Sequence, residues 1–245
     1  MGIPTYNNSK GLLETIKSII NQDYTNLQII VSDNSSTNYN IHELLSDLVQ
    51  NDKRINVIQH SSNIGIMPNF KYVLNQAKGE YFMWAADDDM WASSYISDCL
   101  SIFFDNLDCV TAFCHFDVID INTKEISQRI VPTSCSSNSQ LFRVFTRLYE
   151  MTPNMIYGLH KTEIIRKVNI ETLDWSDVFI TIQLAYYGKI FIIPKYLHSV
   201  GTDGPRKPYS LTSKYVSFKI FRKNMIKFTK NKFPFSHRII LLILM

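Results

Sequence analysis

The chain has 245 residues, of which 45% are hydrophobic and 19% are charged, with only eight glycines and eight prolines. This composition excludes collagen-like and disordered proteins and indicates one globular domain with a full core, with room for a small appendage. The net charge is +3, but ten of the 25 basic residues and none of the 22 acidic residues lie in 206–245, which leaves 15 basic and 22 acidic groups in 1–205. An acidic body with a basic C-terminal segment is expected to meet an anionic surface through that segment.

The cysteines and the start of the chain point to a cytoplasmic protein. No two cysteines have C-x-x-C spacing and no histidine cluster accompanies them, so we expect reduced, buried thiols and neither a zinc site nor a disulfide framework. They are Cys99, Cys109, Cys114 and Cys135. The first residues do not resemble a signal peptide, and no run of about 20 apolar residues predicts a complete membrane-spanning helix.

Strands and helices alternate over residues 1–90. After a short apolar start and a turn at 4–8, the apolar spacing predicts helices around 12–20, 41–49 and 70–77 and strands at 27–31, 55–58 and 81–86. This alternation indicates βαβ units and a mostly parallel sheet. Right-handed crossovers then place the ends of the strands at one edge, so Asp33 and Asp87–Asp89 should face the same cleft.

The stretch Tyr81–Ala86 is apolar, has the length of a strand, and ends in three consecutive carboxylates, Asp87, Asp88 and Asp89. Open α/β sheets bind their ligands beyond the carboxyl ends of such buried strands. Adjacent carboxylates repel one another, and Mg²⁺ or Mn²⁺ relieves that repulsion with one or two carboxylates and the phosphate oxygens of a substrate. We therefore predict that Asp87 and Asp89 hold a metal that binds a nucleotide diphosphate. The alternative is a polar turn in which an Asp caps the next helix.

Residues 91–205 are expected to form the second half of the domain. Apolar spacing predicts helices around 96–103, 141–148 and 179–185, and strands at 110–114, 116–121, 155–160 and 190–193. Residues 201–212 read as a Gly- and Pro-containing loop that could act as a lid. Trp84 and Trp91 flank the acidic cluster, and we expect them to pack in the core rather than to stack on a sugar.

The C-terminal segment 206–245 is predicted to contain a basic amphipathic helix. Phe218, Phe221, Met225 and Phe228 share one helical face, and lysines occupy the opposite face. Such a helix can lie on an anionic membrane, and residues 213–245 are our candidate for that contact. The alternative is a helix packed on the catalytic domain with its lysines in water. Nucleic-acid binding is not expected, because the body is acidic and the aromatic residues segregate from the lysines.

Five short motifs in order resemble the family 2 glycosyltransferases, which have the GT-A fold. They are Pro4-Thr5-Tyr6-Asn7, Val31-Ser32-Asp33-Asn34-Ser35-Ser36, Asn63-Ile64-Gly65 with Asn69, Gly79-Glu80-Tyr81 leading into Asp87-Asp88-Asp89, and Trp175-Ser176-Asp177 followed by 184–190. The resemblance covers roughly residues 2–200. It implies an α/β, Rossmann-like, mostly parallel sheet with helices on both faces, with 1–90 as the nucleotide-binding half and 91–205 as the acceptor-binding half.

The resemblance also implies an inverting hexosyltransferase that uses a nucleotide-activated sugar, by default UDP-linked, in the assembly of surface polysaccharide or lipopolysaccharide. Pro4, Thr5 and Tyr6 would line the base pocket, and Asp33 would accept a hydrogen bond from the imide of a uracil-type base. Asp33 could instead be an Asx-turn residue that bonds its own backbone. The donor site would also include Asn63 and Gly65.

At the reacting end, the resemblance makes Asp87 and Asp89 the metal ligands, for Mn²⁺ or Mg²⁺, with Asp88 beside the donor sugar. Asp177 would be the catalytic base, with Asp174 as the second candidate, although an Asp at a helix start is also favoured by the helix dipole in any protein. Relatives commonly carry a Tyr-Arg pair where this chain has His198-Ser199. We assign no catalytic role to His198, His160 or His115.

The expected partners are a nucleotide-sugar donor, a glycan or lipid-linked glycan acceptor, and the inner face of the plasma membrane. Two other functions stay open. A sugar-phosphate nucleotidyltransferase would need a Gly-rich loop with Arg or Lys after the first strand, and Pro4–Asn8 lacks one. An inactive nucleotide-sugar-binding or membrane-scaffold protein would need no catalysis at all.

Overall fold

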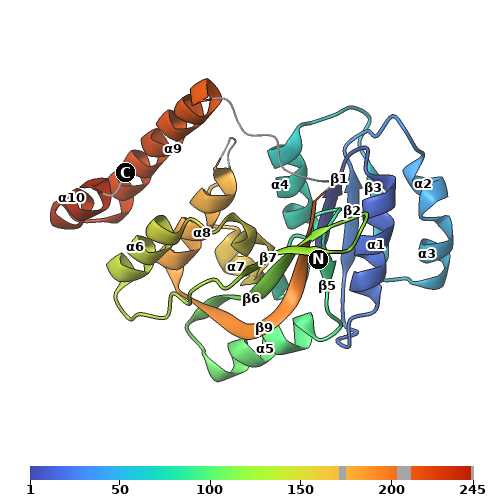
Figure 1. Cartoon of the computed structure of the whole chain (residues 1–245), viewed down its shortest axis with the longest axis horizontal. Coiled ribbons are helices and arrows are strands. Elements are labelled where there is room, and N and C mark those ends of the chain that lie inside the picture. The colour runs from blue at the N-terminus through green and yellow to red at the C-terminus, as the bar shows by residue number, and fades with distance from the viewer. Residues whose placement is uncertain (171–174, 203–210, 244–245) are drawn as a thin grey trace.

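The computed structural model describes residues 1–170, 175–202 and 211–243, which form a layered α/β structure (Figure 1). The first part of the chain alternates strands and helices as expected. In order, these elements are β1 (Gly2–Thr5), α1 (Ser9–Ile20), β2 (Ile29–Asp33), α2 (Ile41–Leu44), α3 (Ser46–Asn51), β3 (Ile55–Gln59), α4 (Ile66–Gln76) and β4 (Tyr81–Phe82).

The second part begins at the acidic turn, and its two C-terminal helices lie at the end of the molecule away from β1–β3 (Figure 1). Its elements are β5 (Met90–Trp91), α5 (Tyr95–Asp105), β6 (Cys109–Asp120), β7 (Ile126–Ile130), α6 (Gln140–Glu150), the 3₁₀ helix η1 (Pro153–Tyr157), β8 (Leu159–Lys161), α7 (Thr162–Ile165), α8 (Ser176–Tyr187), β9 (Lys189–Thr202), α9 (Leu211–Lys232) and α10 (Phe235–Ile243).

The first three strands form a parallel sheet in the order β1-β2-β3, with Thr5 opposite Asp33. The segment after β4 lies along the free edge of β1, because the Gly2 amide donates to Met83 O and the Ala85 amide donates to Gly2 O, both at 2.9 Å. Through this segment the parallel sheet meets a second sheet of order β4-β8-β6-β9-β5, with β7 beside β6. The predicted strand at 81–86 is therefore central, as expected, although its regular part is only two residues long.

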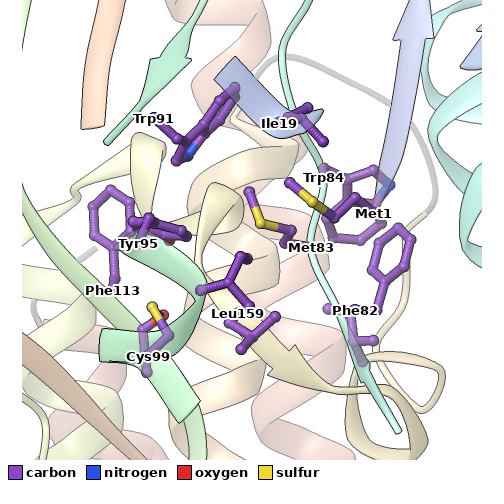
Figure 2. Packing of buried hydrophobic residues seen from close by; sticks show 14 of the residues in the cluster. Met1, Ile19, Phe82, Met83, Trp84, Trp91, Tyr95, Cys99, Phe113 and Leu159 are labelled. Carbon is purple, nitrogen blue, oxygen red and sulfur yellow. Dashed lines mark hydrogen bonds between the residues drawn. The ribbon is translucent and has the colours of Figure 1, made fainter. Parts of the chain in front are cut away.

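The core lies where the two sheets meet. Trp84 and Phe82 are fully buried there beside Met83 and Leu159, while Trp91 packs near Tyr95 and Phe113 (Figure 2). The Trp84 ring also donates its N–H to Phe70 O at 2.9 Å, so this polar atom is satisfied inside the core. The expectation that Trp84 and Trp91 serve packing is confirmed by their exposures of 0% and 5%.

Several elements of the second half differ from the sequence prediction. The two expected strands at 110–114 and 116–121 form one 12-residue strand, β6, which pairs with the unpredicted β7. The expected strand at 155–160 is mostly η1, and only its end joins β8. β9 continues through Pro194 instead of ending before it. The ladder with β6 shifts register between Cys114 and Phe116, so the sheet tolerates the backbone N–H that Pro194 lacks.

The basic amphipathic helix expected within 206–245 exists as α9, and its apolar face contacts protein. Phe221, Met225 and Phe228 are buried in a cluster with residues of α6 and α8, among them Val144 and Phe179. Of the two arrangements predicted for this face, packing on the catalytic domain is thus the one observed. Lys219, Lys223, Lys227 and Lys230 are exposed on the other side.

Other expectations concern the thiols and the loops. All four cysteines are free and buried, and burial raises the pKa of Cys109 and Cys114 to about 12, so the prediction of inert thiols is confirmed. No helix in the described part of the chain is both long and apolar enough to cross a membrane. Most of the lid candidate at 201–212, and Asp174, fall outside the described residues.

Candidate functional site

The first strand and the acidic turn meet through Thr5. Its hydroxyl donates to Asp87 Oδ2 at 2.6 Å, while Thr5 lies opposite Asp33 in the β1–β2 ladder. The Asn8 side chain, which also caps α1, donates to Asp87 Oδ1 at 3.2 Å and to the Asp87 carbonyl at 3.0 Å. The predicted convergence of Asp33 and Asp87 at one edge of the sheet is therefore confirmed, although 54 residues separate them.

The Asp87 carboxyl lies in a partly buried place, and desolvation raises its pKa above the ordinary value. Hydrogen bonds from Thr5, Asn8 and the Tyr6 backbone act in the opposite direction, because they favour the ionised form. Pro4 and Thr5 are buried at the end of β1, whereas Tyr6 is 46% exposed beyond it. The Tyr6 side chain is thus available to a ligand at this edge.

Asp33 is fully buried and holds its own turn. Both carboxylate oxygens accept from the Ser36 amide at 3.2 Å, the Ser36 hydroxyl donates to Oδ1, and the Gln59 side chain donates to Oδ2 at 3.2 Å. The turn then docks on the loop after β1, because the Asn7 amide donates to Ser36 Oγ at 2.8 Å. The Asx-turn arrangement is therefore present, and it fixes the loops that flank Thr5 and Tyr6.

Asn63 and Gly65 lie in the turn between β3 and α4, at the same edge of the sheet. Asn63 Oδ1 accepts from the Asn34 side chain at 3.1 Å and from the Gly65 amide at 2.9 Å, and Asn34 Oδ1 accepts from the Ile64 amide at 2.8 Å. Gly65 has φ +93°, a left-handed conformation that a side chain would strain, and it begins α4. These contacts join the turn after β3 to the turn after β2.

Asp89 points the other way, into the second half. It is only 1% exposed, and its Oδ2 lies 2.8 Å from His198 Nε2, while Oδ1 accepts from the Gly201 amide at 3.0 Å. The His198 ring stacks on Trp91 with centroids 4.9 Å apart. Thr15 of α1 donates to the Asp89 carbonyl at 2.8 Å. Asp89 thus fastens the acidic turn to β9.

Gly201 is needed where β9 passes the turn. A Cβ at this position would lie 2.1 Å from the Asp88 carbonyl oxygen, a distance at which backbone must move. Asp88 itself is partly exposed and lies between the two anchored carboxylates. The backbone of β9 therefore approaches the acidic turn more closely than any residue with a side chain would allow.

Asp177 lies in the first turn of α8. The neighbouring Ser176 hydroxyl contacts Met67 Sδ of α4 at 3.4 Å, and Asp177 Oδ1 accepts from the Val178 amide at 2.7 Å. Tyr157, at the end of η1, lies close enough to several of the carboxylates for their charges to act on its hydroxyl. Burial raises the pKa of Tyr157, and the charges of Asp89, Asp88, Asp177 and Asp87 raise it further.

A cavity of about 790 Å³ opens on the second sheet, beside β6, β7 and the end of β9. Phe116, Val118, Val200 and Thr202 form its floor, and the β7 hairpin and the end of α6 form its walls. Its acidic side chains are Asp120, Glu125 and Glu150, and none of the described residues that line it is Lys or Arg. The cavity lies near the acidic turn. Its lining residue Phe116 has its ring 6.0 Å from the ring of His198, and His198 bonds to Asp89 of the turn.

The carboxylates of the turn have the right chemistry for a hard divalent cation, but they do not form a complete metal site by themselves. Among the residues that the structure describes, no group of three or more His, Cys, Asp or Glu is arranged to hold a metal ion. Asp87 is partly exposed and Asp89 is buried, and in both carboxylates each oxygen already accepts a hydrogen bond. The residues thus fit an ion whose shell is completed by substrate oxygens, as Mg²⁺ often requires.

Comparison with known proteins agrees with this geometry. The family model for Glycosyl transferase family 2 matches residues 1–172. Two curated relatives are an uncharacterized glycosyltransferase of Haemophilus influenzae, 28% identical over 60% of each chain, and the GalNAc(5)-diNAcBac-PP-undecaprenol beta-1,3-glucosyltransferase of Campylobacter jejuni, 35% identical over 39% of this chain and 31% of that protein. The chain belongs to glycosyltransferase family 2. It spans about 60% or less of the length of these relatives.

Two solved structures share the fold. S. aureus TarS in complex with UDP-GlcNAc superposes with a TM-score of 0.72 at 18% identity, covering 98% of this chain and 69% of that one. A mannosyltransferase of Pyrobaculum calidifontis in complex with GDP-Man and Mn²⁺ has a TM-score of 0.59 at 15% identity, covering 85% and 57%. The predicted GT-A fold is thereby confirmed.

Three residues at this edge were missed by sequence reasoning. Asn8 was read only as part of a turn, and its Asn-x-x-Gly spacing to Gly11, which makes it the cap of α1, was the available signal. The sequence drew attention to His198, because relatives commonly have a Tyr-Arg pair at 198–199. It gave no indication that His198 bonds to Asp89. Tyr157 gave no signal, because it lay in a segment predicted to be a strand.

Proposed function

We propose that this chain transfers a sugar from a nucleotide-sugar donor, by default UDP-linked, to a hydroxyl of a glycan or lipid-linked glycan during assembly of cell-surface polysaccharide. The single observation that carries the proposal is the bond from Thr5 to Asp87, which brings the acidic turn beside Asp33 at the end of β1. One cleft would then hold Asp33 for base recognition, the acidic turn for the departing diphosphate, and Asp177 as the base.

The donor would lie across the ends of β1, β2 and the segment 83–85. Pro4, Thr5 and Tyr6 would line the base pocket, with Asn63 and Gly65 shaping its far wall. Asp33 would accept the imide N–H of a uracil-type base in exchange for its hydrogen bond from the Ser36 hydroxyl. The buried, multiply bonded carboxylate is well placed for this role, because its position is fixed before the ligand arrives.

A divalent cation, Mn²⁺ or Mg²⁺, would be held by Asp87 and by Asp89, the latter giving up one of its present hydrogen bonds. When bound, such an ion stabilises the negative charge that grows on the departing diphosphate. Asp88 would lie beside the donor sugar. Thr5 and Asn8 keep Asp87 oriented, and their hydrogen bonds oppose the rise in pKa that burial causes, which favours the ionised form that a cation needs.

Asp177 would take the proton from the attacking acceptor hydroxyl. A positioned general base contributes about 10²–10⁴-fold to the rate. Attack from the side of α8, opposite the diphosphate, would invert the anomeric centre with one base and no covalent intermediate. Tyr157 keeps its proton, since burial and the surrounding carboxylates raise its pKa, and its hydroxyl can therefore donate a hydrogen bond to a sugar oxygen.

The acceptor would occupy the cavity of about 790 Å³ in the second half. A lining rich in carboxylates, hydroxyls and amides, with Ser127, Gln128 and Asn154 among them, suits a neutral polyhydroxylated chain. Such a lining would repel an acidic sugar. We further propose that the basic face of α9 brings the enzyme to the inner face of the plasma membrane, where a lipid-linked acceptor is found.

Nucleotide release from a panel of sugar donors, with Mn²⁺ and with chelator, tests the proposal. Turnover that needs both an acceptor and the cation, with one donor preferred, is the expected result. Tight donor binding with no nucleotide release, in the presence of any glycan acceptor tried, would instead identify an inactive binding protein. Turnover that ignores the chelator would remove the metal role of Asp87 and Asp89.

A further inference from the structure

A second cavity, of about 420 Å³, lies between α8, α9 and the segment after α7. We call it the lysine groove. Its basic residues are Lys167, Lys223, Lys227 and Lys232, and its amide side chains are Asn169, Gln183, Asn224 and Asn231. Phe179, Phe228 and Ile220 form an apolar floor.

The groove is held in shape by bonds between its walls. Gln183, which is 4% exposed, accepts from the Asn169 amide at 3.0 Å and donates to the Asn169 carbonyl at 3.1 Å. The Tyr187 hydroxyl donates to the Lys167 carbonyl at 3.4 Å. The backbone that carries Lys167 is thus fixed on α8, facing the lysines of α9.

Within the part of the chain that the structure describes, no acidic side chain balances the positive charge of the groove. No described residue that lines it is Asp or Glu, and within the described chain Lys167, Lys223 and Lys227 form no ion pair. Lys232 lies over the rings of Tyr186 and Tyr187, at 5.4 and 5.5 Å. Like charges drawn together from two sides repel one another until an anion enters between them.

We propose that the lysine groove binds a multivalent phosphate anion that is not the sugar donor. The groove runs along α8 from Phe179 to Tyr187, and Gln183 and Tyr187 lie about 9 and 15 Å along the helix axis from Asp177. Its concave shape, with cations on two sides and amides between them, matches a discrete diphosphate or phosphodiester better than a flat membrane. Under the proposed transfer reaction, and resting on it, this anion is the phosphate-bearing part of the acceptor.

Calorimetric titration of the full chain with tripolyphosphate, in chelator and at low salt, tests the site. We expect binding that weakens by at least about tenfold in the double variant Lys223→Gln/Lys227→Gln, because charge-assisted hydrogen bonds are lost. Lys53→Gln/Lys78→Gln removes the same charge from exposed positions in the first half and should bind like the parent. Equal weakening in both variants would reduce the effect to overall charge and overturn the proposal.

Lysine acetylation read by mass spectrometry locates the anion. Tripolyphosphate should protect Lys167, Lys223 and Lys227 and leave Lys53 reactive. A parent that ignores tripolyphosphate yet binds phosphatidylglycerol vesicles through Lys223 and Lys227 would make the surface a membrane contact and also overturn the proposal. UDP affinity in Mn²⁺ should be the same in all variants, so failure of the donor site and failure of the groove are separate results.

Discussion

Asp87 and Asp89 are two residues apart in one turn, yet their side chains bond to different halves of the molecule. Asp87 is partly exposed and bonded to Thr5 and Asn8 beside β1. Asp89 is buried and bonded to His198 and Gly201 of β9. One carboxylate is kept at the edge where a donor would bind, and the other fixes that edge to the half that would hold the acceptor. A motif of adjacent acids can thus divide ligand binding and domain assembly between its members.

The division of labour across this turn can be tested from both sides. The largest effect should come from Asp177, the proposed catalytic base of the second half. Asp177→Asn keeps an oxygen for the Val178 amide but removes the base, so kcat should fall about 10²–10⁴-fold while UDP affinity and unfolding midpoint are kept. Steady-state kinetics measure the change, with the exposed Asp105→Asn as a matched control. Normal turnover in Asp177→Asn would end the base assignment.

The interior of the second half should make the protein sensitive to acid. His160 is buried between Thr111 and the Ile156 carbonyl, and burial lowers its pKa from 6.5 to about 4. The unfolded chain therefore binds a proton that the folded chain does not, and stability is present above pH 6.5 and lost as the pH falls toward 4. The loss is about 3 kcal/mol.

Urea unfolding across this pH range measures that loss. In His160→Gln the slope of stability against pH should flatten, although the variant is less stable at neutral pH. The same change at the exposed His42 should leave the slope as it is in the parent. A slope unchanged by His160→Gln would show that other groups cause the acid sensitivity.

The link between Asp89 and β9 depends on the close approach of Gly201. In Gly201→Ala the new Cβ would meet the Asp88 carbonyl, so the turn or β9 must shift, at a cost of about 1–3 kcal/mol. We expect lower stability together with weaker UDP binding in Mn²⁺. Ser199→Ala on the same strand should change neither. Loss of stability with UDP affinity intact would mean that the two halves are not coupled through this turn.

The smallest effect is expected at Thr5, on the donor side. Burial raises the Asp87 pKa, so the ionised form costs stability at neutral pH, and that cost is relieved as the pH falls through the folded pKa. Donor binding that needs the ionised form should therefore fail on acidification at a higher pH than an ordinary carboxylate would cause. Thr5→Val removes a bond that favours ionisation, so the midpoint of Mn²⁺-dependent UDP binding should rise further. A midpoint that falls would contradict this assignment.

The first half could be predicted well because its signals are local. The apolar stripe Leu12–Ile19, the short buried strands and right-handed crossovers are enough to bring Asp33 and Asp87 together. The second half depends on contacts between distant segments. The pairing of β6 with β9, the register shift that admits Pro194, and the bond from His198 to Asp89 across 109 residues leave no periodic pattern in the sequence.

Dependence on distant segments also explains why the sequence predicted the helix α9 but did not decide what its apolar face contacts. Its amphipathic pattern gave the helix correctly, but an apolar stripe has the same spacing whether it faces lipid or protein. The surface that covers it, made by Val144, Phe179 and their neighbours on α6 and α8, is assembled from segments distant in sequence: 84 residues separate Val144 from Phe228. Likewise, the run Asp87-Asp88-Asp89 does not indicate which residues each carboxylate will bond.

The most direct test of the account is calorimetric titration of UDP into the full chain, with Mn²⁺ and with chelator, in the parent and in Asp87→Asn. The account predicts binding in Mn²⁺ that weakens by at least about tenfold on chelation and by a similar factor in the variant, as loss of one charged contact implies. UDP binding of equal strength in all four conditions, or no binding in any, would contradict it.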